Sequence, residues 1–143
     1  MISPAQVGEL FCLSRVTGDM GPIEGMLTPS LEQAIDTAIE KDIAWGAANP
    51  GEKPPLGDGI PWQAWPDYAP DCTVGEVANA AADEATVPIS YAFPDAPDAN
   101  FTDTLHVTES IDVRRSIPVW RIDNVQYATG GDLKAFLASA FSN

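Results

Sequence analysis

The order of helical and strand patterns along this chain predicts an α+β fold, with N-terminal helices packed on a curved antiparallel sheet that a short C-terminal helix closes. Three observations indicate it. Apolar residues recur at helical spacing before residue 50, at a period of two between residues 87 and 127, and at helical spacing again after Gly130-Gly131. The length of 143 residues suits one hydrophobic core, so we treat residues 1–143 as a single domain.

Two helices are expected in the first third of the chain. Ser3 is placed to cap the first helix, with Pro4 at its first position and Gln6 at the spacing of a capping box. A longer helix starts at Thr28-Pro29 and ends by Asn49, because Pro50 disfavours a helical conformation in the residue before it. Its expected buried face consists of Leu31, Ile35, Ala38, Ile39 and Ile43.

Alternating apolar residues predict strands in the second half, beginning with a short one at 73–77 and an alanine-rich connection at 78–85. Pro88 removes one ladder hydrogen bond from the next strand, so an edge or a bulge is expected near it. The last strand, residues 117–127, changes parity after Ile122. A β-bulge near Asp123-Asn124 would bring both halves of its apolar pattern into one core. Asp132 caps the final helix, whose apolar stripe is Leu133, Phe136, Leu137, Ala140 and Phe141.

The last strand also carries a resemblance to a known family. Residues 120–125, Trp-Arg-Ile-Asp-Asn-Val, resemble the W-K-I-D-D-I strand of the nuclear transport factor 2-like superfamily. Gly130-Gly131 with the terminal helix, and the Leu27-Thr28-Pro29 helix entry, are similar to the bacterial branch of that superfamily known as domain of unknown function 3828. The resemblance implies a cone with a pocket at its wide end. It also implies a periplasmic or secreted protein, since family members are often exported, with a cytoplasmic location as the alternative; the sequence opens directly into a capped helix, and no leader is visible in it.

No catalytic or metal-binding motif accompanies this resemblance. Enzymes with such a cone place an Asp–His or Asp–Arg pair in the pocket, whereas the single histidine, His106, is expected to point away from the core that its neighbours fill. The chain has no G-x-S-x-G elbow. Cys12, Cys72 and His106 lack zinc-ligand spacing, and the aspartates at 95, 98 and 103 lack the glycine and spacing of a calcium loop. We therefore expect no enzyme, metal or cofactor.

Residues 50–71 form a proline- and tryptophan-rich loop that contains six of the thirteen prolines. A mobile, solvated loop would not carry so many large aromatic side chains, so we expect it to be packed. In the functional interpretation, Trp62, Trp65 and Tyr68 line the pocket mouth and bind an apolar or cationic ligand, with Asp58 at the rim and Lys53 at the start of the segment. In the structural alternative, the aromatics only fasten the loop to the sheet.

The net charge of −14, from 21 acidic and 7 basic residues, disfavours nucleic acid and anionic membranes as partners. No apolar run approaches the roughly 20 residues of a membrane span. Glu32, Asp36 and Glu40 recur four residues apart on the outer face of the long helix. They form either an ordinary solvated face or an acidic ridge for a basic partner.

Cys12 and Cys72 are the only cysteines, and their spacing leaves two interpretations open. A disulfide between them would close a long loop and imply an oxidising compartment, whereas two buried thiols would indicate the cytosol.

Together these observations predict a non-enzymatic binding domain of the bacterial envelope, with a small-molecule or peptide pocket at the open end of the cone. The alternative is an acidic protein-interaction module, such as an immunity protein that neutralises a basic toxin. The sequence leaves the oligomeric state open, a dimer included.

Overall fold

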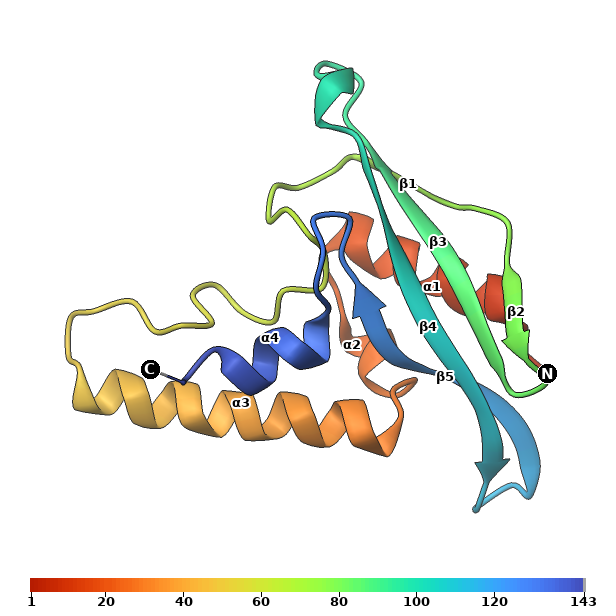
Figure 1. Ribbon diagram of the computed structural model, residues 1–143, viewed down its shortest axis with the longest axis horizontal. Helices are drawn as coiled ribbons and strands as arrows, with labels where there is room; N and C mark the ends of the chain where they lie inside the picture. The colour runs from red at the N-terminus through yellow and green to blue at the C-terminus, as the bar shows by residue number, and fades with distance from the viewer. Residues whose placement is uncertain (143) are drawn as a thin grey trace.

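The computed structural model describes residues 1–142 and confirms the predicted α+β class, with a curled antiparallel sheet, helices and a short C-terminal helix (Figure 1). The strands are β1 (Asp71–Val74), β2 (Ala78–Ala81), β3 (Glu84–Ala92), β4 (Phe101–Asp112) and β5 (Ile117–Gln126). They are ordered β1-β3-β4-β5, and β2 also pairs with β3. The helices are α1 (Pro4–Thr17), α2 (Gly21–Glu24), α3 (Pro29–Ala48) and α4 (Leu133–Ser139), with a 3₁₀ turn η1 (Pro97–Ala99).

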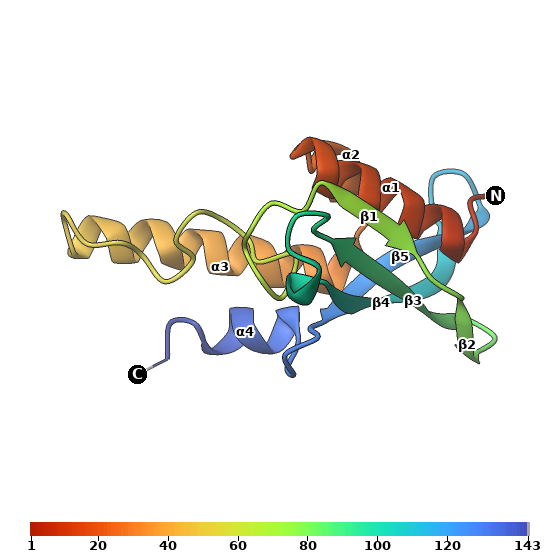
Figure 2. The ribbon, with the colours of Figure 1, turned by 90° about the horizontal axis from the view of Figure 1, so that it is seen from above.

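Helix α1 lies against the inner face of the sheet, as the view from above shows (Figure 2). It starts with the predicted capping box, in which Ser3 and Gln6 exchange hydrogen bonds. Val7 and Phe11 are completely buried, and a Cβ atom on Gly8 would come within 2.7 Å of Val87 Cγ1. Glycine at this position therefore allows α1 to pack closely on β3.

The predicted β-bulge in β5 is present. His106 pairs with Asn124, whereas Val107 pairs with Ile122, so Asp123 is the extra residue. Ile122 and Val125 are consequently both buried, although their positions differ in parity. The segment around Leu27 then adds a parallel bridge to Ile122, with hydrogen bonds of 2.8 and 2.9 Å to the Ile122 backbone.

Pro88 does not lie in an edge strand, because β3 is interior in the sheet. It sits where β3 changes partner, since Ile89 pairs with Val74 of β1 and Thr86 pairs with Ala78 of β2. Residues 75–77, between β1 and β2, form no regular ladder with β3. The backbone N–H that Pro88 lacks is therefore not needed there, and proline is tolerated. The prediction of a connection at residues 78–85 is wrong in part, because Ala78–Ala81 form strand β2. All four residues of β2 are exposed, so the strand has no alternation of buried apolar residues by which the sequence could predict it.

Helix α3 starts at Thr28-Pro29 and ends before Asn49 as expected, with Thr28 as its N-cap, but its predicted buried face is only partly correct. Leu31, Ile35 and Ala38 are buried, whereas Ile39 is 40% exposed and Ile43 is 68% exposed. The reason is visible in Figure 1: the second half of α3 projects beyond the sheet, where only α4 and the loop after α3 run beside it. Phe136 of α4 likewise remains 37% exposed.

Cys12 of α1 and Cys72 of β1 form a disulfide, with their Cα atoms 5.3 Å apart and 60 positions separating them in sequence. It joins the helix on the inner face to one side of the sheet.

We expect removal of this disulfide to reduce the stability of the protein, because the unfolded chain gains conformational entropy when the cross-link is absent. For a loop of this length the chain-entropy model gives about 4 kcal/mol. Denaturant unfolding of the oxidised protein, the reduced protein and the Cys12→Ser/Cys72→Ser variant measures the loss. Reductant should leave the double variant unchanged, and equal unfolding midpoints for oxidised and reduced wild type would contradict the prediction.

Candidate functional site

The proline- and tryptophan-rich loop is attached to the body of the protein. Trp62 is 7% exposed and packs edge-on against Phe11 of α1, with ring centroids 6.3 Å apart. The loop backbone is also bonded, since Tyr127 donates its hydroxyl to the Pro61 carbonyl at 2.6 Å and the Leu56 amide donates to Asp42 at 3.0 Å. Trp62 thus acts as an anchor of the loop.

The other proposed ligand residues of this loop do not converge on Trp62. Trp65 is 53% exposed and Tyr68 is 65% exposed. Lys53 and Asp58 form an exposed ion pair at 3.5 Å. A ligand role for these four residues stays a prediction, and the variant Trp65→Ala tests it for the tryptophan.

Inside the sheet, the loop covers a small polar network centred on Asp103 of β4. Asp103 is 1% exposed, and its two carboxylate oxygens accept hydrogen bonds from the backbone amides of Ala64, at 2.9 Å, and Ala128, at 2.8 Å. Arg15 of α1 donates through Nε to Gln63 Oε1 at 2.8 Å, and Gln63 in turn donates to the Trp65 and Asp67 carbonyls.

The electrostatics of this network reflect its burial. Burial raises the pKa of Asp103, and the two backbone amides and the charge of Arg15 oppose that rise. Burial likewise raises the pKa of Tyr91, whose hydroxyl has no hydrogen-bond partner among residues 1–142. An Asp and an Arg therefore do lie inside the sheet, where one oxygen of Asp103 and the Nε–H of Arg15 bond to residues of the loop and help to hold it in place.

In the sequence, Asp103 stands out only as one of three aspartates that fall short of a calcium-loop pattern. Its parity was the missed signal, because it alternates with Leu105 and Val107, which point into the core. His106 points to the other side, as expected, and contacts Gln126 at 3.1 Å. Within residues 1–142, no three side chains of the metal-ligating types gather in one place.

The bulge residue Asp123 connects three elements. Its carboxylate accepts hydrogen bonds from Thr28, the N-cap of α3, at 2.8 Å and from Lys134 of α4 at 2.9 Å. Burial alone would raise the pKa of Asp123, but the hydrogen bonds from Lys134 and Thr28 lower it below its ordinary value. This carboxylate holds the start of α3 and α4 against the sheet.

The three residues of the acidic ridge, Glu32, Asp36 and Glu40, are all exposed on α3. They line a shallow depression of about 430 Å³ together with Pro29, Gln33 and Thr37. The exposed Ile39 and Ile43 lie on the same helix face, so carboxylates and apolar groups are presented together.

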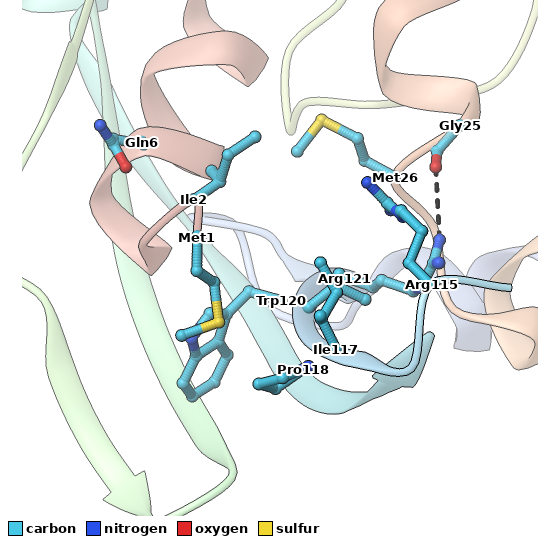
Figure 3. A pocket seen from close by; sticks show the side chains of 11 residues that line it. Met1, Ile2, Gln6, Gly25, Met26, Arg115, Ile117, Pro118, Trp120 and Arg121 are labelled. Atoms are coloured by element: carbon cyan, nitrogen blue, oxygen red, sulfur yellow. Dashed lines mark hydrogen bonds between the residues drawn. The ribbon is translucent and has the colours of Figure 1, made fainter. Parts of the chain in front are cut away.

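A separate cavity of about 480 Å³ lies between the N-terminus, the end of α2 and the first half of β5 (Figure 3). The cavity lies at the edge of β5, beside the part of the strand that the bridge at Leu27 leaves uncovered. It does not lie at the proline- and tryptophan-rich loop. Most of its wall is apolar, and its charged lining residues are two arginines. The lining residues are Met1, Ile2, Gln6, Gly25, Met26, Arg115, Ile117, Pro118, Val119, Trp120 and Arg121.

Asp112 at the end of β4 fixes both arginines. Its Oδ2 atom accepts hydrogen bonds from Arg121 at 3.0 Å and from Arg115 at 3.1 Å. Arg121 also donates to the Gly25 carbonyl at 3.3 Å, which ties β5 to the end of α2. Hydrogen bonds from Arg115, first from its side chain and then from its backbone, lower the pKa of Asp112 to about 2, so this carboxylate is ionised at neutral pH.

The fold and this cavity define a small α+β domain with a hollow beside the edge strand β5. No family model, curated protein or solved structure matches the chain. No helix within the described part of the chain has the length and apolar character needed to cross a membrane.

We expect Asp103→Ala to destabilise the loop, because it removes the acceptor of the amides of Ala64, which is half-buried, and Ala128, which is exposed. An unsatisfied buried group costs about 1–3 kcal/mol, and only the Ala64 amide is shielded from water, so the free energy of unfolding should fall by about 1–3 kcal/mol. Denaturant unfolding measures this loss, and amide hydrogen exchange at residues 60–69 reports the loosening. Asp98→Ala, which removes an exposed carboxylate, is the matched control. A variant at 103 as stable as the one at 98 would disprove the anchoring role.

Proposed function

We propose that this protein is a non-enzymatic binding domain whose ligand occupies the cavity beside Trp120. The observation that carries this proposal is the cavity itself: its volume falls in the range of small-molecule sites, roughly 300–1,000 Å³. A wall of apolar groups with a few polar groups at defined positions is the usual composition of such sites.

The proposed pocket differs in position from the one expected at the wide end of the cone. There the inner face of the sheet is filled by α1, by Trp62 and by the residues that surround Asp103. At β5 the strand edge is open, and the side chains of Met1 and Trp120 lie at one side of the pocket, with Gly25 and the hydrogen bond that Arg121 donates to it at the other (Figure 3). A small molecule entering here would contact the strand that carries the resemblance to the nuclear transport factor 2-like superfamily.

We further propose that the protein works in an oxidising compartment, either periplasmic or extracellular. The disulfide between Cys12 and Cys72 supports this, because such bonds persist outside the reducing cytosol. The proposed membership of a family whose members are often exported agrees with it.

Trp120 should be required for ligand binding. Trp120→Ala removes the one aromatic side chain of the pocket wall, so we expect the affinity for an apolar ligand found by NMR screening to fall about tenfold or more. Chemical-shift changes at Met26 and residues 117–121 would locate the ligand, and calorimetry would measure the affinity. Trp120→Phe should retain most of the binding.

Trp65→Ala is the matched control, because Trp65 is an exposed tryptophan outside the cavity wall. If Trp65→Ala removes binding and Trp120→Ala does not, the site lies on the proline- and tryptophan-rich loop and the proposed location is wrong.

A second candidate function is an acidic protein-interaction module, such as an immunity protein that binds a basic toxin. The specific observation is the outer face of α3, where the acidic ridge adjoins the exposed Ile39 and Ile43. A basic surface with apolar side chains would complement both features.

If α3 is such a surface, the affinity for a cationic helical peptide of lysine and leucine should fall steeply with salt. Glu32→Gln/Asp36→Asn/Glu40→Gln should weaken that binding about tenfold and flatten its salt dependence. Glu76→Gln/Asp83→Asn/Asp95→Asn changes the same charge at exposed positions elsewhere and is the control. Equal losses in both triple variants, measured by titration at two ionic strengths, would show that only the net charge matters.

A further inference from the structure

The positive charge of this protein is concentrated next to the proposed pocket. The chain has only seven basic residues, and three of them, Arg114, Arg115 and Arg121, lie within eight positions of each other at the hairpin of β4 and β5. Two of these three line the cavity, and no aspartate or glutamate is among the lining residues. The cavity wall is therefore cationic in a protein whose net charge is −14.

Asp112 only partly neutralises this charge. Its single carboxylate stands between two guanidinium groups, so the cluster keeps a net positive charge of about one. Each guanidinium has five N–H donors, and Arg115 uses one of them on Asp112, while Arg121 uses one on Asp112 and one on the Gly25 carbonyl. Several donors of each arginine remain available to an incoming acceptor.

The geometry of the cluster is fixed in advance. The carboxylate of Asp112 also accepts the backbone amides of Arg114 and Arg115, at 2.9 and 3.0 Å, which sets the conformation of the turn. The Arg121 side chain is 25% exposed and is held at both ends of its guanidinium, whereas the Arg115 side chain is 63% exposed. An anion that met these arginines would find one donor group already oriented, which reduces the entropy lost on binding.

The rest of the wall is mostly apolar, with Gln6 as its one other polar side chain. Met26, Ile117, Pro118, Val119 and the indole of Trp120 offer apolar area, and Met1 and Ile2 add to it. Burial of matching apolar area would supply roughly 25 cal/mol per Å². Small polar anions would gain little from this wall, and neutral apolar molecules would leave the arginines unused.

We propose, on the basis of the binding function proposed above, that the ligand of this cavity is an anionic amphiphile: an apolar body that carries one carboxylate or another singly charged acidic group. The acidic group contacts Arg115 and Arg121, and the apolar body lies along Trp120 and Met26. The acidic surface of the protein does not prevent this, because charges farther apart than about 8 Å are largely screened at physiological salt.

Three probes with similar straight alkyl chains and different head groups test the proposal: decanoate, decanol and decyltrimethylammonium. Binding to the oxidised full chain is measured by calorimetry and by the indole N–H signal of Trp120, which Trp120→Phe identifies. We expect decanoate to bind about tenfold more tightly than decanol and decyltrimethylammonium to bind most weakly. Acetate, which has the head group without the apolar body, should not perturb Trp120.

Arg115→Gln and Arg114→Gln form the matched pair of variants, because they are adjacent and remove the same charge, but only Arg115 lines the cavity. Arg115→Gln should weaken decanoate binding about tenfold and leave decanol binding unchanged, whereas Arg114→Gln should change neither by more than about twofold. Arg115 is mostly exposed, so its variant is expected to fold normally, and circular dichroism checks this.

The outcomes separate the two proposals. If decanol binds at Trp120 as tightly as decanoate, or if both arginine variants weaken decanoate equally, the cavity binds ligands but the acidic-group assignment is overturned. If decyltrimethylammonium binds most tightly, the assignment is likewise overturned. If none of the three probes perturbs Trp120 or gives heat, the anionic amphiphile and the proposed binding function are both contradicted.

Discussion

The rest of the structure depends on the β-bulge at Asp123. The extra residue turns Ile122 and Val125 to the same side, so both halves of β5 contribute to one core. It also releases the Asp123 carboxylate to bind Thr28 at the start of α3 and Lys134 in α4. A single inserted residue thereby curves the strand, fixes two helices and sets where the Leu27 segment covers β5. The uncovered part of β5 is the wall of the proposed pocket.

A second constraint explains why the interior of the sheet is filled. Asp103 is buried on the inner face, and a buried carboxylate needs hydrogen-bond donors. The amides of Ala64 and Ala128 supply them, and the first of these brings the proline- and tryptophan-rich loop into the opening of the cone. Trp62 then packs on Phe11 and completes the core. The loop is thus part of the folded body for two reasons: it supplies a hydrogen-bond donor to the buried Asp103 carboxylate, and it buries the Trp62 side chain.

Charge is distributed unevenly over the two surfaces that carry our proposals. The outer face of α3 presents carboxylates beside exposed isoleucines, and the β4–β5 hairpin presents arginines beside an apolar hollow. The two surfaces favour ligands of opposite charge, so one set of charged and neutral probes distinguishes them. Neither surface is apparent from the net charge, which is a sum over the whole chain.

The sequence by itself determined the features that depend on neighbouring residues: the caps at Ser3 and Asp132, the start of α3 at Thr28-Pro29, the α+β order of elements, and the bulge that the parity change in β5 requires. These are local, because caps, turns and periodicity act within a few positions. Only the tertiary structure decided that Ile39 and Ile43 remain exposed, that Asp103 receives the loop, and that the cavity lies at β5. Each of these depends on groups far apart in sequence, such as Ala64 with Asp103 or Gly25 with Arg121. Helical or strand periodicity carries no information about which distant element will cover a given face.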